Sequence, residues 1–284
     1  MNIYLYGWLH PKNLNAIKSY KSINIITDSN QIDKCDIIYC PSNYINPDKY
    51  PNKIFIFGPH FSVFPNEDYV KLLLNHKNKC IYTQPSQWAK DVWINMIPHK
   101  NDIIRVLPFG VDTERFSEIQ PIDNRHSVFI YYKSRNPNEL KMLENFLGNN
   151  HVSYRIFSYD QKYSENDYLE YLQKSKYGIV LDRHESQGFA LEEALSCNVP
   201  LLVWDATNMN QELNQNYPSI AATSIPYWDS RCGEYFYEYS DLDSKFKIFL
   251  ERLDTYRPRE FILENLSIDK CEQKLISLIN SLKQ

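Results

Sequence analysis

The sequence has few glycines and several common motifs are absent from it. Only seven of its 284 residues are glycine, and the fingerprint G-x-G-x-x-G does not occur. Because that fingerprint lets the backbone approach a dinucleotide, its absence argues against an NAD-dependent dehydrogenase. No apolar run approaches the ~18 residues of a membrane-spanning helix, and the first residues lack the pattern of a signal peptide. We therefore expect no transmembrane segment.

An excess of basic charge is also missing. Lys and Arg together number 31 against 35 Asp and Glu, a net charge of −4, whereas nucleic-acid binders show a basic footprint. The six cysteines form no C-x-x-C pair, which disfavours a zinc site. Reduced thiols in a core are the simpler interpretation, and they predict a cytoplasmic protein. The charge balance predicts that the protein does not bind nucleic acid.

Short apolar segments alternate with longer amphipathic ones along most of the chain. The apolar segments are four to six residues long and continuously hydrophobic, which is typical of strands buried on both faces of a parallel sheet. The predicted strands are Asn2–Tyr6, Ile23–Thr27, Asp36–Cys40, Lys53–Phe57, Lys79–Thr83, Ile103–Leu107, Ser127–Tyr132, Ser153–Phe157, Tyr177–Leu181, Pro200–Val203 and Ile220–Thr223. The predicted helices are Glu67–Asn75, Ser86–Met96, Pro137–Leu147, Glu165–Lys174, Phe189–Cys197 and Ile268–Leu282.

This alternation predicts an α/β protein with parallel sheets and right-handed crossovers. Residues 117–126 are polar and contain a proline, so we interpret them as a linker between two Rossmann-like domains. The domains are predicted at 1–117 and 127–265, with 266–284 as a carboxyl-terminal helix that packs back toward the first domain. Ligands of such domains bind at the carboxyl ends of the strands.

The segment from 177 to 205 carries the strongest chemical signal. A buried strand ends in a polar turn, and a helix is predicted to begin at Phe189. Gly188 gives the turn backbone freedom, and the amide groups of Gly188, Phe189 and Ala190 at the helix start favour anionic oxygens. Glu185 precedes the helix and Glu193 lies on its second turn. Two carboxylates placed in this way could accept hydrogen bonds from two groups of hydroxyls on one extended ligand.

This segment resembles the donor-binding motif of retaining glycosyltransferases with the GT-B fold, of the broad family-4 type. The matched positions are Glu185, Gly188, Phe189, Leu191, Glu193, Ala194, Cys197 and Pro200. The resemblance implies that Glu185 contacts the transferred sugar and Glu193 the nucleotide ribose. It also places Gln187, Gly188, Phe189 and Ala190 at the donor, although Gln187 and Asn198 depart from the usual pattern. Solvated glutamates at an ordinary helix start are the alternative.

Two basic residues follow the first strand of the second domain. Lys133 and Arg135 lie between a predicted strand and a predicted helix, where the family has a basic pair that neutralises the donor diphosphate. An arginine fork and a lysine point charge suit that role. In the family the arginine comes first and the lysine about five residues later, so the order here is different. Surface charges on a loop are the alternative interpretation.

The first half of the chain matches the family more loosely. His60 follows a buried strand, where family members often have a histidine that faces the transferred sugar. Gly7 follows the first strand, where the family has a glycine-containing loop near the diphosphate. The string LPFGVDTERF, residues 107–116, resembles the one that closes the first domain. Residues 222–239 are rich in aromatic side chains, and contact with the nucleotide and a packed aromatic hairpin are both open.

Together these features predict a GT-B glycosyltransferase that uses a nucleoside-diphosphate sugar as substrate and needs no metal or other cofactor. Glu185, His60, Lys133 and Arg135 are the expected catalytic residues. The departing phosphate oxygen could take the proton of the acceptor. A glycan, a lipid and a protein are all open as the acceptor. The alternatives are a catalytically silent protein that binds sugar nucleotides, and another GT-B enzyme that inverts the sugar or is a phosphorylase.

Overall fold

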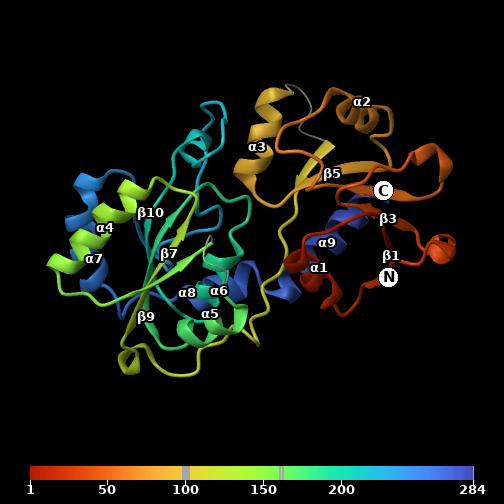
Figure 1. Cartoon of the computed structure of the whole chain (residues 1–284). Coiled ribbons are helices and arrows are strands. Elements are labelled where there is room, and N and C mark those ends of the chain that lie inside the picture. The colour runs from red at the N-terminus through yellow and green to blue at the C-terminus, as the bar shows by residue number, and fades with distance from the viewer. Residues whose placement is uncertain (98–102, 160, 162, 284) are drawn as a thin grey trace. The chain divides into compact units, whose positions relative to one another are not determined.

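The computed structural model describes residues 1–97, 103–159, 161 and 163–283, which form two α/β units. Unit 1 comprises Met1–Gly110 and Leu266–Gln284, and unit 2 comprises Val111–Asn265 (Figure 1). The chain therefore divides between Gly110 and Val111, just before the predicted linker, which lies within unit 2. None of the helices in the described part of the chain has the length and apolar character needed to cross a bilayer.

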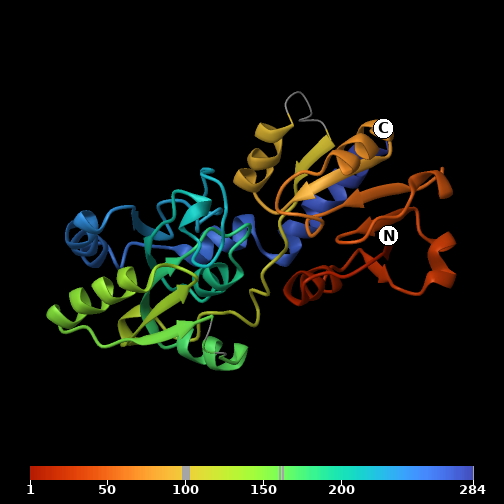
Figure 2. The ribbon, with the colours of Figure 1, turned by 45° about the horizontal axis from the view of Figure 1, so that its top comes forward.

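Unit 1 is built on a six-stranded parallel sheet in the order β2-β1-β3-β4-β5-β6. The strands are β1 (Asn2–Leu5), β2 (Asn24–Ile26), β3 (Ile37–Cys40), β4 (Ile54–Phe57), β5 (Cys80–Gln84) and β6 (Ile104–Val106), with helices α1 (Pro11–Lys18), α2 (Glu67–Asn75), α3 (Gln87–Met96) and α9 (Ile268–Leu282). Every residue of β3 is buried, as expected for a central strand covered on both faces. Helix α9 lies beside α1 in both ribbon views (Figures 1 and 2).

Unit 2 holds a five-stranded parallel sheet in the order β11-β10-β9-β7-β8. Its strands are β7 (Ser127–Lys133), β8 (Arg155–Ser158), β9 (Ser175–Asp182), β10 (Leu201–Trp204) and β11 (Gly233–Phe236), with helices α4 (Pro137–Asn149), α5 (Glu165–Leu172), α6 (Phe189–Ser196), α7 (Leu242–Glu251) and α8 (Pro258–Asn265). Helices α4 and α7 cover one face of the sheet, and α5 and α6 the other (Figure 1). Leu143 of α4 and Phe249 of α7 are fully buried against the first face.

One predicted strand is wrong. Residues 220–223 form no strand, although Ala221 makes an isolated bridge to Asn208. The carboxylate of Asp205 accepts hydrogen bonds from Thr223 and Ser224, so side-chain contacts rather than a ladder hold this segment. The edge strand is instead β11, inside the aromatic-rich segment, which is therefore not a hairpin.

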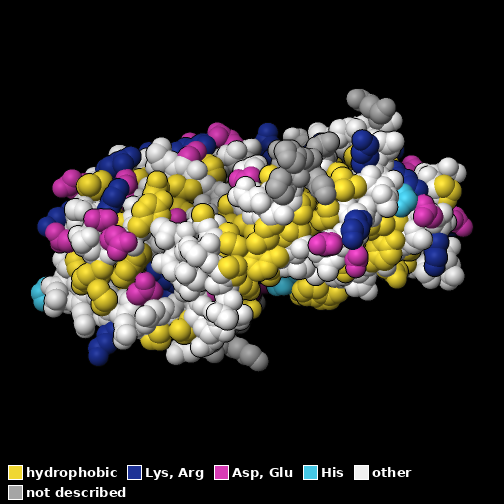
Figure 3. Space-filling view, turned by 90° about the horizontal axis from the view of Figure 1, so that it is seen from above, with side chains coloured by type: hydrophobic (Ala, Val, Ile, Leu, Met, Phe, Trp, Pro, Cys, Tyr) yellow, Lys and Arg dark blue, Asp and Glu magenta, His cyan; other side chains and the backbone are white. Residues whose placement is uncertain are grey.

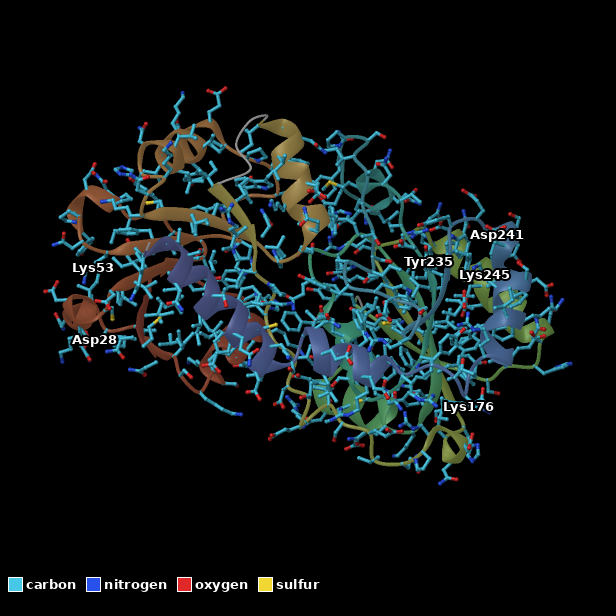
Figure 4. All side chains as sticks on the ribbon, turned by 180° about the vertical axis from the view of Figure 1, so that it is seen from behind. Asp28, Lys53, Lys176, Tyr235, Asp241 and Lys245 are labelled. Carbon is cyan, nitrogen blue, oxygen red and sulfur yellow. The ribbon has the colours of Figure 1, made fainter. Side chains whose placement is uncertain are left out.

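The predicted helices did not include α1, α7 and α8. Figure 4 shows Tyr235 of β11 near Lys245 of α7, and Lys245 pairs with Glu234 at 3.3 Å.

The six cysteines are buried free thiols. Acidic and basic side chains are interspersed over the face of each unit that Figure 3 shows.

Glu272 joins α9 to the body of unit 1. Its buried carboxylate accepts hydrogen bonds from the backbone amides of Lys21 at 3.1 Å and Ser22 at 2.5 Å. Replacing it with alanine leaves two amides without that acceptor, so Glu272→Ala should lower the free energy of unfolding by about 1–3 kcal/mol. Urea denaturation measures this. Asp269→Ala, which removes an exposed ion pair with Lys21 and an exposed acidic charge from the first turn of α9, should cost less, about 1 kcal/mol. Equal effects would contradict the assignment.

Candidate functional site

The topology of unit 2 defines where a ligand can bind. The chain leaves β7 to form β8 on one side, and then crosses to form β9 on the other side. In open parallel sheets this switch point opens a crevice at the carboxyl ends of the two central strands. The last residue of β7 is Lys133 and the last residue of β9 is Asp182, and the two are paired in register. Functional side chains are therefore expected on and just after these residues.

Lys133 and Glu185 meet at this switch point. The Nζ of Lys133 donates a hydrogen bond to Oε1 of Glu185, and the two side chains are only 12% and 14% exposed. Burial alone would lower the pKa of Lys133, but the carboxylates of Glu185 and Asp182 raise it above its ordinary value. The lysine is therefore charged at neutral pH. Two of the predicted site residues are brought together as an ion pair.

Arg183 is a functional candidate that the sequence analysis missed. It follows β9 directly, and its guanidinium lies 3.0 Å from a carboxylate oxygen of Glu212 and 4.0 Å from Oε1 of Glu185. Its side chain is 26% exposed, so a ligand can reach it. The signal was present, because the first residues after a central parallel strand lie at the ligand-binding edge.

Arg135 occupies a different place from the one predicted. It is fully buried, and its Nε and Nη2 donate to the carboxylate of Glu139 at 2.9 and 2.8 Å. Its Nη1 donates to the carbonyl oxygen of Asp182 at 3.1 Å and lies 3.5 Å from that of Trp204. This geometry does not support contact between Arg135 and a diphosphate. The guanidinium instead connects the start of α4 to the carboxyl ends of β9 and β10.

Helix α6 begins at Phe189, shortly after Glu185 in the sequence, so its first turn also belongs to the candidate site. Gly188 caps the helix with a φ of +90°, a left-handed conformation that disfavours any other residue. Leu191 and Glu192 donate their amides to the carbonyl of Gly188, so Phe189 and Ala190 form the first turn, where the helix dipole favours an anion. Both side chains are partly exposed.

The two glutamates of α6, Glu192 and Glu193, are both buried. Glu193 is 4% exposed and lies near the buried ring of Tyr168, whose pKa is raised well above its ordinary value by burial first and by nearby charges that include Glu193. Glu192 is 2% exposed and accepts a hydrogen bond from Gln187 at 3.1 Å. Gln187, Gly188 and Glu192 also line a small pocket together with residues 224–228. Glu192 and Glu193 are therefore equally buried but have different neighbours.

Gly7 and His60 belong to unit 1, at the carboxyl ends of β1 and β4. Gly7 has a φ of +103°, and a side chain there would come within 3.0 Å of Ser42 and Asn43. The Nε2 atom of His60 lies 3.2 Å from Nδ2 of Asn13. Burial first, and then His10, lowers the pKa of His60 to about 4, so the imidazole is neutral at neutral pH.

Metal ligands do not gather in the described part of the chain: no group of three or more His, Cys, Asp or Glu residues there could hold an ion. The string Asp241-Leu242-Asp243 resembles a diphosphate-metal motif, but it lies at the start of α7 (Figure 4). Asp243 there pairs with Lys247 at 2.6 Å. We therefore give this string no role in ligand binding.

The fold can be compared with known structures. No protein-family model matches the sequence, and no curated protein matches it. The structure is similar to a glycosyltransferase from Rickettsia africae ESF-5 (TM-score 0.64, 11% identity, covering 100% of this chain and 98% of that one) and to the apo form of the lipopolysaccharide outer core galactosyltransferase WaaB (TM-score 0.60, 14% identity, 99% of each). It is also similar to TarM (TM-score 0.58, 15% identity), covering 86% of this chain and 54% of TarM.

These neighbours identify the class of fold. The chain has the GT-B fold, with two Rossmann-like α/β units. The fold predicted from the sequence is confirmed. At 11–15% identity the likeness establishes the fold alone, and it assigns no residue a role.

The buried carboxyl group of Asp182 leads to a prediction about the stability of the protein. It is fully buried, and neither carboxylate oxygen has a hydrogen-bond partner among the described residues. Burial first, and then Glu185, raises its pKa well above the ordinary value. The folded state therefore holds this proton more tightly than the unfolded state, and stability falls as pH rises through the interval between the two pKa values. Asp182→Asn should stabilise the protein at neutral pH by about 1 kcal/mol or more.

Urea denaturation between pH 4 and pH 8 tests this, with the gain expected to grow as pH rises. Asp205→Ala is the contrasting variant, because Asp205 is also buried but its Oδ1 atom accepts hydrogen bonds from Thr223 and Ser224. That variant should be destabilised, since alanine leaves those donors without their acceptor. If Asp182→Asn lost stability as Asp205→Ala does, Asp182 would be an ionised and structurally required group.

Proposed function

We propose that this protein is a glycosyltransferase that moves a sugar from a nucleoside-diphosphate sugar to an acceptor hydroxyl. The observation that carries the proposal is the Lys133–Glu185 ion pair at the switch point between β7 and β9. It sets a cation suited to phosphate beside a carboxylate suited to sugar hydroxyls, at the edge where parallel sheets bind ligands. The GT-B fold and the glycosyltransferases that share it support the same function.

In this proposal the donor exchanges partners with the ion pair. The diphosphate takes Lys133 and the more exposed Arg183, and Glu185 is released to accept hydrogen bonds from hydroxyls of the transferred sugar. The first turn of α6, at Phe189 and Ala190, contributes its dipole. Glu193, which is buried near Tyr168, accepts hydrogen bonds from the ribose. Arg135 is a positioning residue that holds the carbonyl of Asp182 at the edge.

The chemical step follows from this charge arrangement. The bond between the anomeric carbon and the phosphate oxygen breaks, and its electron pair goes to the diphosphate. Lys133 and Arg183 stabilise the negative charge that grows on the diphosphate. Preorganised charges lower the barrier most when they face the charge that develops in the transition state. The acceptor oxygen bonds to the anomeric carbon, and its proton passes to the departing phosphate oxygen. We propose retention of configuration and no metal requirement, which anomer analysis of the product and addition of a chelator test.

Arg183 and Arg135 separate the functional cation from the structural one. Arg183→Gln should reduce transfer about 10²-fold, the scale for losing one preorganised electrostatic group. It also removes the ion pair with Glu212, so its turnover is measured on protein that is shown to be folded. Arg135→Gln should mainly lower the unfolding midpoint, because it removes buried contacts to Glu139 and to two strand ends. Turnover with sugar nucleotides and urea denaturation measure both. The assignment is wrong if Arg135→Gln is stable but inactive while Arg183→Gln is fully active.

The consecutive glutamates Glu192 and Glu193 give a matched pair for nucleotide binding. Glu193→Gln should weaken binding of the preferred nucleoside diphosphate about tenfold or more, because a charged hydrogen-bond acceptor is lost. Glu192→Gln, equally buried but bonded to Gln187, should bind normally. Calorimetry after a thermal-shift screen of UDP, GDP and ADP measures this. Wild-type protein that binds none of these nucleotides would refute the proposed function, and binding without turnover would indicate a silent sugar-nucleotide-binding protein.

A further inference from the structure

The chain between β10 and β11 is bonded to the ends of two other strands of unit 2. The backbone amide of Leu213 donates a hydrogen bond at 2.8 Å to the carbonyl oxygen of Ser134, which follows β7. The carbonyl oxygen of Thr223 accepts a hydrogen bond at 3.0 Å from the amide of Glu185, which follows β9. This segment therefore connects both sides of the switch point of the sheet.

Glu212 lies in this segment, and its backbone is held in place. It follows the 3₁₀ turn Met209–Gln211, which is closed by reciprocal hydrogen bonds between Asn208 and Gln211. The side chain of Met209 is buried, and the amide of Glu212 donates to the carbonyl oxygen of Met209 at 3.2 Å. The carboxylate therefore extends from a fixed backbone, as a group that orients another side chain requires.

Arg183 directs its two terminal nitrogens to two different carboxylates. Nη1 donates a hydrogen bond to Oε2 of Glu212 at 3.0 Å, whereas Nη2 lies 4.0 Å from Oε1 of Glu185, beyond hydrogen-bond distance. The side chain of Glu212 is 10% exposed and that of Arg183 is 26% exposed. A diphosphate that displaces Glu185 from Lys133 would therefore meet Nη2, while Nη1 stays bonded to Glu212.

A second neighbour of Glu212 carries no charge. Nε2 of His184 lies 3.6 Å from the same Oε2 atom. Burial first, and then Arg183, lowers the pKa of His184 to about 4, so the imidazole is neutral at neutral pH. Burial raises the pKa of Glu212, and Arg183 opposes that effect. The hydrogen-bonded ion pair of this carboxylate is therefore with Arg183.

We propose that Glu212 is a positioning residue, which binds one end of the guanidinium of Arg183 and thereby presents the other end to a diphosphate. The inference rests on the proposed function for the origin of that diphosphate, a sugar nucleotide. An arginine side chain has many rotamers, so one that is oriented in advance loses less entropy when it binds phosphate. Glu212 acts only through Arg183. Its negative charge also weakens the attraction of the edge for an anion, so orientation and charge have opposite effects on affinity.

Two substitutions at Glu212 separate orientation from charge. Glu212→Ala and Glu212→Gln both remove the negative charge, but only glutamine keeps an oxygen that can accept a hydrogen bond from Nη1. The probe is inorganic pyrophosphate, and calorimetry on protein that is shown to be folded measures its dissociation constant. Glu212→Ala should bind pyrophosphate about tenfold more weakly than Glu212→Gln, the lower end of the effect found for groups that orient metal ligands.

Two controls show whether Glu212 acts through Arg183. When the two substitutions are combined with Arg183→Gln, the resulting double variants should bind pyrophosphate with equal affinity, because the guanidinium that Glu212 orients is gone. Glu264→Ala removes a carboxylate that pairs with Arg231 at 2.7 Å elsewhere in unit 2. That variant should bind pyrophosphate like the wild type.

The inference is overturned if Glu212→Ala and Glu212→Gln bind pyrophosphate equally well. Tighter binding by Glu212→Ala also overturns it, because Glu212 would then compete with phosphate for Arg183. A difference that persists with Arg183→Gln contradicts it as well, since Glu212 would then support the fold rather than the arginine. So does a wild-type protein that does not bind pyrophosphate. The expected pattern without transfer from any sugar nucleotide would refute the proposed function and support this inference.

Discussion

An ion pair that is largely withdrawn from water lies at the carboxyl edge of the sheet of unit 2. Lys133 and Glu185 come from two neighbouring strand ends, and removing both charges from water costs free energy that their attraction must offset. Such a pair is poor evidence for stability, and sits where a ligand could exchange with it. The surrounding groups fit that role. Arg183 lies within reach of Glu185. Arg135 donates a hydrogen bond to the carbonyl of Asp182 at the end of β9, the strand that Arg183 and Glu185 follow.

The same constraint explains why charge is distributed unevenly around the site. Two carboxyl groups near one lysine repel each other, and the more deeply buried one, Asp182, is driven toward its neutral form. Glu185 forms the ion pair with Lys133, while Arg183 is balanced by Glu212. In the absence of a ligand the edge is therefore nearly neutral overall, and a diphosphate would find two cations already in place.

Local patterns in the sequence were sufficient for most of the architecture. Buried parallel strands read as continuous apolar runs, so β1 to β10 were located to within one or two residues of their observed ends. The error at 220–223 has a physical cause, because Ile, Ala and Thr there suit a strand but Asp205 holds the segment by side-chain bonds. Glu185 and Lys133 were correctly placed after strands, but their contact depends on the pairing of β7 with β9. Arg135 could not be told from Arg183 by sequence, because burial is decided by packing against α4 and β10.

The central claim is that a sugar nucleotide opens the Lys133–Glu185 pair. A crystal structure of the protein with its preferred nucleoside-diphosphate sugar tests it most directly. The account predicts phosphate oxygens within hydrogen-bond distance of Nζ of Lys133, and Glu185 turned to a sugar hydroxyl. A bound donor whose diphosphate lies elsewhere, with the Lys133–Glu185 pair intact, would contradict it.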